Sequence, residues 1–173
     1  MKRSDILEMP EYFEKYIHQV DDLELSQAFN ESIKQLDELD QNFLARLDGK
    51  RYAPGKWTTK ETIQHIIDWE RILTFRTILF ARKEGSVPQG VDGDLLAAHM
   101  KAERRELDDL IAELRITRLS TKAMFDGFDD ETLQNAGINW KYETSVLAMG
   151  FTIIGHQIHH LKIIKEKYYP LAA

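Results

Sequence analysis

The chain has 173 residues, of which 43% are hydrophobic and 30% charged, and this balance predicts one globular domain spanning residues 1–173. Its net charge of −6 makes nucleic acid and anionic membranes unexpected partners, and its lack of cysteine excludes disulfides, thiolate metal ligands and a cysteine nucleophile. Because no stretch approaches the roughly 18 apolar residues of a membrane span and no leader-like segment opens the chain, we expect a cytoplasmic protein.

The first part of the chain predicts a short helix followed by a long one. Residues 1–22 are expected to form a peripheral N-terminal segment, with a short extra helix around residues 12–17 packed on the outside. Over residues 25–47, apolar side chains recur at steps of three, four or seven, which is the spacing of one helix face. These side chains are Phe29, Ile33, Leu36, Phe43 and Leu47. We therefore predict one amphipathic helix over residues 25–47.

A second helix is predicted after the turn-forming residues Gly49, Pro54 and Gly55. Thr58 and Glu61 have the spacing of a capping box, in which the threonine hydroxyl accepts a hydrogen bond from the Glu61 amide and the glutamate carboxylate accepts one from the Thr58 amide. Apolar residues continue at helical spacing to about residue 82, before a loop rich in Gly and Pro. The segment therefore predicts a helix over about residues 58–82.

Two more helices complete the predicted fold. Asp94 can cap a third helix that runs to about Met124, and a structured connection with one helical turn at residues 130–134 follows it. Thr144 or Ser145 can cap the last helix, which ends before Pro170. Four long helices in one small domain predict an all-α fold, a four-helix bundle.

Three of the six histidines, His156, His159 and His160, lie close together on the last predicted helix. The inward apolar stripe of this helix, continued in steps of three and four, reaches His156 and His160. These two residues differ by about 40° around the helix axis, so both imidazoles can reach one ion, whereas His159 lies about 100° from His160. The helical phase therefore favours His156 and His160 over His159 as metal ligands.

A pair of neutral imidazoles four residues apart is a chelate for borderline divalent ions such as zinc, nickel, copper and iron. Two ligands hold an ion weakly, and His65, mid-way along the second predicted helix, is the candidate third ligand. Three histidines would leave a coordination position open, as in catalytic zinc sites. Asp68 could accept the distal N–H of a ligand imidazole or ligate the ion itself. The alternative is that the histidines are core or surface residues with ordinary hydrogen bonds.

Other conspicuous side chains have structural interpretations. Trp57, Trp69 and Trp140 are expected to pack in the core, and shaping the mouth of a substrate site is their alternative role. Glu61 is expected to be a helix cap rather than a catalyst.

Two stretches of this sequence resemble the DinB/YfiT-like superfamily. One covers residues 54–61 and 64–71, including His65, Asp68 and Trp69, and continues through Phe75-Arg76 and residues 80–82. The other is the Gly-His-x-x-His-His pattern of residues 155–160. Both occur in the order and separation typical of the family, and the resemblance extends over about residues 25–169.

The resemblance implies a four-helix bundle that holds a divalent ion, commonly zinc or nickel, through one histidine of the second helix and two of the last. On this sequence those residues are His65, His156 and His160, in agreement with the helical phase. The resemblance also implies a homodimer.

Three functions are compatible with this resemblance. Characterised branches attach low-molecular-weight thiols such as bacillithiol to electrophiles or isomerise maleylpyruvate with a thiol cofactor. The leading hypothesis is therefore an enzyme whose metal ion activates a small thiol for transfer to a small-molecule electrophile. The second is a hydrolase that uses metal-bound water, with Asp68 or Glu61 as the available base. The third is a non-enzymatic stress-response or binding module with a structural or vestigial ion.

Overall fold

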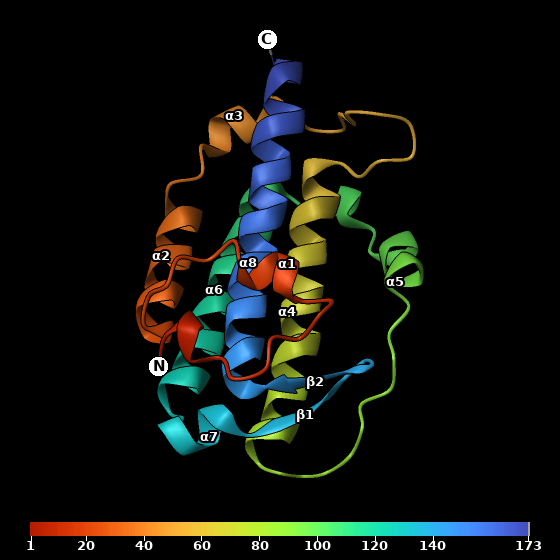
Figure 1. The fold of residues 1–173 in the computed structure, drawn as a ribbon. Coiled ribbons are helices and arrows are strands. Elements are labelled where there is room, and N and C mark those ends of the chain that lie inside the picture. Colours follow the sequence, from red (N-terminus) through yellow and green to blue (C-terminus); the bar gives the residue numbers. More distant parts are fainter. Residues whose placement is uncertain (173) are drawn as a thin grey trace.

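The computed structural model describes residues 1–172, and four long helices form its bundle (Figure 1). The bundle helices are α2 (Leu25–Asp37), α4 (Thr59–Ala81), α6 (Leu107–Asp126) and α8 (Val146–Ile163). Shorter helices are α1 (Glu14–Ile17), α3 (Gln41–Ala45), α5 (Gly93–His99) and α7 (Asp130–Gln134). Single turns are the 3₁₀ turns Arg3–Asp5, Ala102–Arg104 and Tyr169–Ala172 and the π-helical turn Ile164–Tyr168, which continues α8. The predicted all-α four-helix bundle is confirmed.

Local capping determines where the helices begin. Both halves of the predicted capping box are present at the start of α4: Thr58 Oγ1 accepts from the Glu61 amide at 3.2 Å, and Glu61 Oε2 accepts from the Thr58 amide at 2.6 Å. At the start of α8 the cap is Ser145, not Thr144, because the Ser145 hydroxyl accepts from the Ala148 amide at 3.1 Å. Within residues 1–172, no helix is both long and apolar enough to span a membrane.

The predicted helix over residues 25–47 is wrong as one element. It is divided into α2 and α3 by a break after Asp37. Asp40 has an extended backbone, and its carboxylate accepts from the Phe43 amide at 2.9 Å, so a new helix begins there. Leu44 and Leu47 are nevertheless buried, because α3 returns the chain to the core.

The predicted third helix is also divided. Asp92, and not Asp94, caps the short helix α5, with its carboxylate accepting from the amides of Asp94 and Leu95 at 3.0 Å each. The chain then turns at Lys101, whose φ of 49° lies in the left-handed region and cannot continue a helix. The long helix α6 begins only at Leu107.

A two-stranded hairpin occupies part of the predicted irregular connection. Strands β1 (Ala136–Asn139) and β2 (Tyr142–Ser145) pair antiparallel, with Asn139 opposite Tyr142. Its two-residue turn begins at Trp140, whose φ is 61°, as tight hairpin turns require. A Cβ atom on Gly137 would lie 2.2 Å from the ring of Phe80, so glycine is what lets β1 approach α4.

A buried ion pair joins all four bundle helices. Arg118 of α6 is fully buried and donates from Nε and Nη2 to the Glu70 carboxylate of α4, at 3.0 and 2.8 Å. Its Nη1 donates to Ser32 Oγ of α2 at 3.0 Å, and its Nη2 donates to the Ile153 carbonyl of α8 at 3.3 Å. This pair therefore sits at the centre of the bundle.

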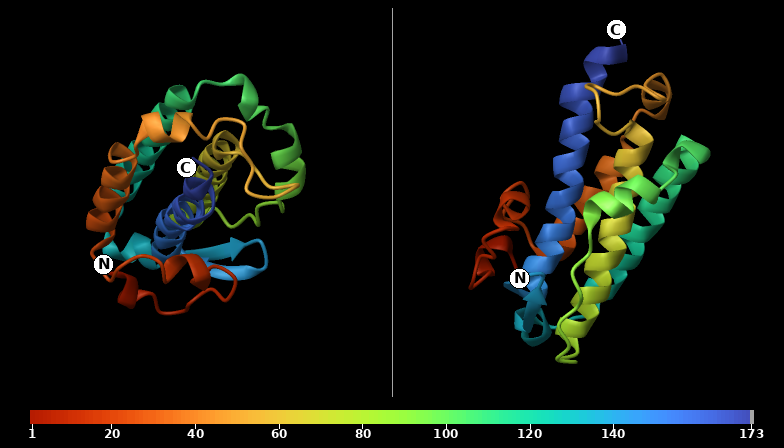
Figure 2. Two further views of the ribbon diagram at one scale, coloured as in Figure 1. Left: turned by 90° about the horizontal axis from the view of Figure 1, so that it is seen from above. Right: turned by 90° about the vertical axis from the view of Figure 1, so that its right-hand side faces the viewer.

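The N-terminal segment crosses the outer side of α8 (Figures 1 and 2). Ile17 of α1 is fully buried, and the Tyr16 carbonyl lies so close to α8 that a Cβ atom on Gly155 would be 2.0 Å from it. Glycine at this position lets α1 pack directly on the α8 backbone.

Replacing Gly155 with alanine is expected to displace α1 and to lower the free energy of unfolding by about 2 kcal/mol, the typical cost of overpacking. Gly127→Ala is the matched control, because the nearest atom to its added methyl is the Met124 carbonyl oxygen, at 3.4 Å. Urea unfolding of the two variants measures the difference. Equal stabilities would show that α1 does not pack tightly on Gly155.

Candidate metal centre

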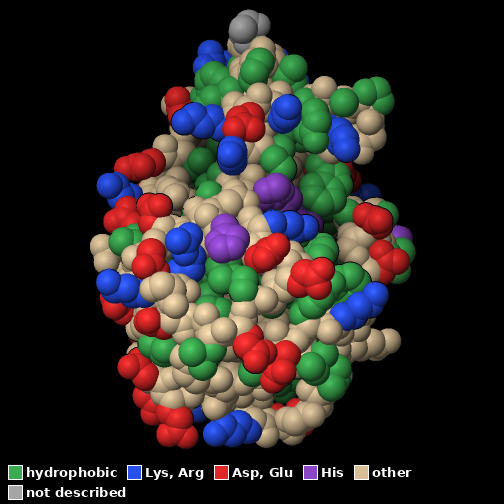
Figure 3. Space-filling view, viewed as in Figure 1, with side chains coloured by type: hydrophobic (Ala, Val, Ile, Leu, Met, Phe, Trp, Pro, Cys, Tyr) green, Lys and Arg blue, Asp and Glu red, His purple; other side chains and the backbone are tan. Residues whose placement is uncertain are grey.

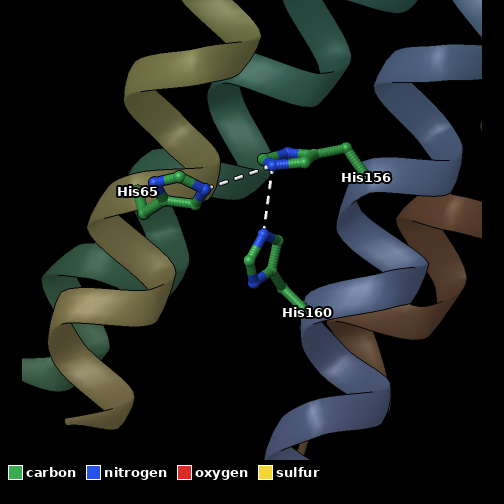
Figure 4. Close-up of side chains that lie close together, drawn as sticks. All are labelled: His65, His156 and His160. Atoms are coloured by element: carbon green, nitrogen blue, oxygen red, sulfur yellow. Dashed lines mark hydrogen bonds between the residues drawn. The ribbon is translucent and has the colours of Figure 1, made fainter. Parts of the chain in front are cut away.

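Three histidine side chains converge between α4 and α8 (Figure 4). His65 comes from α4, and His156 and His160 come from successive turns of α8. The Nε2 atom of His156 lies 3.2 Å from Nε2 of His65 and 3.1 Å from Nε2 of His160. The structure thus brings together the three histidines that the sequence singles out.

His159 lies outside this cluster, as the helical phase predicts. Its ring packs against Tyr16 at 5.4 Å between ring centroids, and its Nδ1 is 3.4 Å from Gln19 Nε2. The side chain is directed toward the N-terminal segment rather than toward α4. His159 is therefore a natural control residue for His160, its neighbour in the chain.

The arrangement of the three Nε2 atoms suits shared coordination of a divalent ion better than hydrogen bonds among the imidazoles. A neutral imidazole Nε2 either carries one hydrogen or offers one lone pair, so His156 Nε2 can form only one good hydrogen bond to its two close neighbours. Three lone pairs directed at one cation satisfy all three atoms. In a tetrahedral site with zinc–nitrogen bonds of about 2.0–2.1 Å, ligand nitrogens lie roughly 3.3 Å apart, close to the separations observed.

Burial keeps these imidazoles neutral and ready to ligate. Burial lowers the pKa of His65 to about 4, with a further contribution from His159. Burial and the adjacent imidazoles lower the pKa of His160 to about 3 and that of the buried His156 well below its ordinary value. Protons therefore do not compete for the three nitrogens at neutral pH.

Both candidate carboxylates accept hydrogen bonds from residues outside the histidine cluster. Asp68 Oδ1 accepts from Gln64 Nε2 at 2.8 Å, and a bond from a ligand imidazole to Asp68 stays a prediction. Burial raises the Asp68 pKa. Glu61 is partly buried, but hydrogen bonds from Arg51 at 2.7 and 3.0 Å and from Thr58 outweigh the burial and lower its pKa. Glu61 is thus the helix cap that the sequence predicts.

A cavity of about 350 Å³ opens beside the cluster, with His65 and His156 in its wall. Six aromatic residues also line it: Tyr12, Phe13, Tyr16, Trp57, Trp69 and Trp140. On the face shown in Figure 3, histidine side chains reach the surface beside hydrophobic ones. The expected core role is wrong for the exposed Trp140, whereas Trp69 is partly buried and packs against the core. All three tryptophans line the cavity, which matches their alternative role.

Three cavity residues, Tyr12, Tyr16 and Arg76, were not predicted from the sequence to belong to the site. Tyr12 and Tyr16 belong to the N-terminal segment, and only the tertiary fold brings that segment to the histidines. Arg76 also lines the cavity, and its position could have been predicted from its spacing. It lies 11 residues after His65, which is three turns along the same helix face.

Comparisons with known proteins agree with this architecture. The model of the DinB superfamily matches residues 8–164. A solved structure of YfiT from Bacillus subtilis, described as a probable metal-dependent hydrolase with an unusual four-helix bundle topology, aligns with a TM-score of 0.68 at 18% identity. The alignment covers 93% of this chain and 88% of that one, so the two share a fold. No curated protein sequence matches the chain significantly.

Proposed function

This chain belongs to the DinB superfamily, and we propose that it is a metal-dependent enzyme that transfers a low-molecular-weight thiol to a small electrophile. In this proposal His65, His156 and His160 hold a divalent ion, zinc or nickel. The observation that carries it is the convergence of three neutral Nε2 atoms at the wall of an aromatic cavity. The proposal includes a single cytoplasmic domain that forms a homodimer.

A divalent ion held there would supply Lewis acidity, which lowers the pKa of a coordinated thiol or water. The chain itself supplies three uncharged ligands and leaves the remaining coordination positions to small molecules. Trp57 packs against His65 with ring centroids 4.5 Å apart, and Tyr16 packs against His156 at 5.2 Å, so aromatic rings fix both imidazoles. The same rings offer an apolar surface to an electrophile and exclude water from it.

The positions of the carboxylates favour a thiol over water as the nucleophile. A hydrolase needs a general base within hydrogen-bond reach of the attacking water. Neither Glu61 nor Asp68 is among the residues that line the cavity, and Glu61 is also bound by Arg51 and Thr58. A thiol has an ordinary pKa of about 8.5, and a bound divalent ion would lower it further, so a thiol would need no such base.

The presence of a cavity favours catalysis over a purely structural ion. Structural zinc sites are usually closed by four protein ligands, whereas catalytic sites keep a position open. Among residues 1–172, the histidine cluster contains three ligand residues and borders the cavity.

Thiol transfer is tested by incubating the zinc-loaded protein with a small thiol, cysteine or bacillithiol, and the chromogenic electrophile 1-chloro-2,4-dinitrobenzene. We expect thioether formation at least tenfold faster than without protein, abolished by a chelator and in His65→Ala. His159→Ala should retain the wild-type rate. Thiol-independent cleavage of a p-nitrophenyl ester that also requires the metal would identify a hydrolase instead.

A further inference from the structure

Arg76 places a positive charge inside the cavity. Its side chain extends from α4, the residue is only 3% exposed, and it lines the same cavity as His65 and His156. A buried charge is costly unless an opposite charge or several hydrogen bonds compensate it. The contacts of Arg76 therefore show how far the protein compensates its buried charge.

The protein compensates the buried charge of Arg76 only in part. Arg76 Nη1 donates to Asn139 Oδ1 at 2.7 Å and Nη2 donates to the Gln89 carbonyl at 3.1 Å. These contacts use two of the five N–H donors of the guanidinium, and within residues 1–172 no carboxylate oxygen lies within 4.0 Å of it. Burial lowers the Arg76 pKa. The remaining N–H groups can donate to an anion.

The second buried arginine, Arg118, has a charge that the protein does compensate. Arg118 is equally enclosed, but it is paired with Glu70 and also donates to Ser32 and Ile153. Arg118 does not line the cavity. The arginine without a carboxylate partner is thus the one that faces the space available to a ligand.

The positions of Arg76 and His65 define an elongated site. Eleven residues separate them on α4, which corresponds to roughly 16 Å along the helix axis and about 20° around it, so both project from one face. The other charged residues of the wall, Asp92 and Asp94, are exposed at the rim, where water screens them, and the Asp92 carboxylate caps α5. Arg76 is therefore the buried charge of the cavity wall.

We propose that Arg76 binds a carboxylate group of the substrate or thiol cosubstrate at the end of the cavity remote from the histidines. A guanidinium matches a carboxylate in a bidentate pair, and exclusion of water strengthens such a pair. This inference rests on the proposed function in one respect: it assumes that the cavity beside the histidines is the substrate site. It adds that the substrate class is anionic and elongated.

The test compares 2-naphthoate with 2-naphthamide, which have nearly the same shape and differ in charge, by isothermal titration calorimetry. We expect the wild-type protein to bind the carboxylate at least tenfold more tightly. Arg76→Gln should reduce this preference to less than twofold, and Arg76→Lys, which keeps the charge but loses the fork, should leave an intermediate one. Arg71→Gln is the matched control, because Arg71 is an exposed arginine of α4 paired with Glu113 outside the cavity.

Each titration is made with chelator-treated and with zinc-loaded protein, because a carboxylate could also bind the ion. A preference seen only with zinc and unchanged in Arg76→Gln would place the carboxylate on the ion and overturn the proposal. Equal affinities of the wild-type protein for the two probes would overturn it without any variant. An Arg76-dependent preference in chelator-treated protein would support it even if the proposed thiol transfer failed.

Discussion

Tag-free protein is expected to contain about one divalent ion per chain. Replacement of His65 with alanine is expected to lower the affinity of the protein for this ion more than about a hundredfold. Even the hydrogen-bond partners of metal ligands typically contribute 10–100-fold to affinity, so loss of one of three ligands should cost more. His156→Ala/His160→Ala, which leaves one ligand, should reduce bound metal to background. Elemental mass spectrometry of the dialysed proteins measures these contents.

The chain provides a matched control for this experiment. His159→Ala removes a half-buried imidazole adjacent to His160 but outside the cluster, and it should retain the ion. Circular dichroism confirms that each variant is folded. A wild-type protein that stays folded but cannot be loaded with zinc or nickel would show that the three histidines are only core residues. Such a result would favour the binding-module alternative.

The three histidines of the cluster are predictable from the sequence because the direction of each depends on the geometry of a regular helix. His156 and His160 continue the apolar stripe of a helix that contains no break, so the 3.6-residue period assigns their direction correctly. His65 lies on a helix whose start is marked by a strong capping box. Two regular helices packed face to face then bring the three rings together.

The elements that periodicity misses depend on single residues or tertiary contacts. The apolar spacing of residues 25–47 continues through the turn between α2 and α3, so the break is invisible without the cap at Asp40. The hairpin depends on Gly137, which lets β1 pass close to Phe80, and on the left-handed turn residue Trp140. Trp140 reaches the cavity only because this hairpin forms.

Hydrophobic periodicity also fails to predict the buried pair of Glu70 and Arg118. Hydrophobic periodicity treats every charged residue as solvent-exposed, yet these two side chains are 2% and 0% exposed. They are 48 residues apart in the sequence, and they lie on different helices, α4 and α6. Only the packing of α4 against α6 shows that they meet at the centre of the bundle.

Replacing Glu70 with glutamine is therefore expected to lower the free energy of unfolding by about 3–5 kcal/mol, because the Arg118 charge stays buried without its partner. Such a loss is a large part of the roughly 5–15 kcal/mol that stabilises a typical domain. The double variant Glu70→Leu/Arg118→Met should recover most of it, since two apolar side chains of similar volume can replace a buried ion pair at little cost.

Urea unfolding of the single and double variants measures the coupling between the two positions. Arg115→Gln is the control, because Arg115 forms a half-exposed ion pair with Asp37, at 2.5 Å, that should contribute less than about 1 kcal/mol. A loss below 1 kcal/mol in Glu70→Gln would mean that water reaches Arg118, so that the centre of the bundle is not closed. A double variant as unstable as the single one would instead assign the stability to the bonds from Arg118 to Ser32 and Ile153.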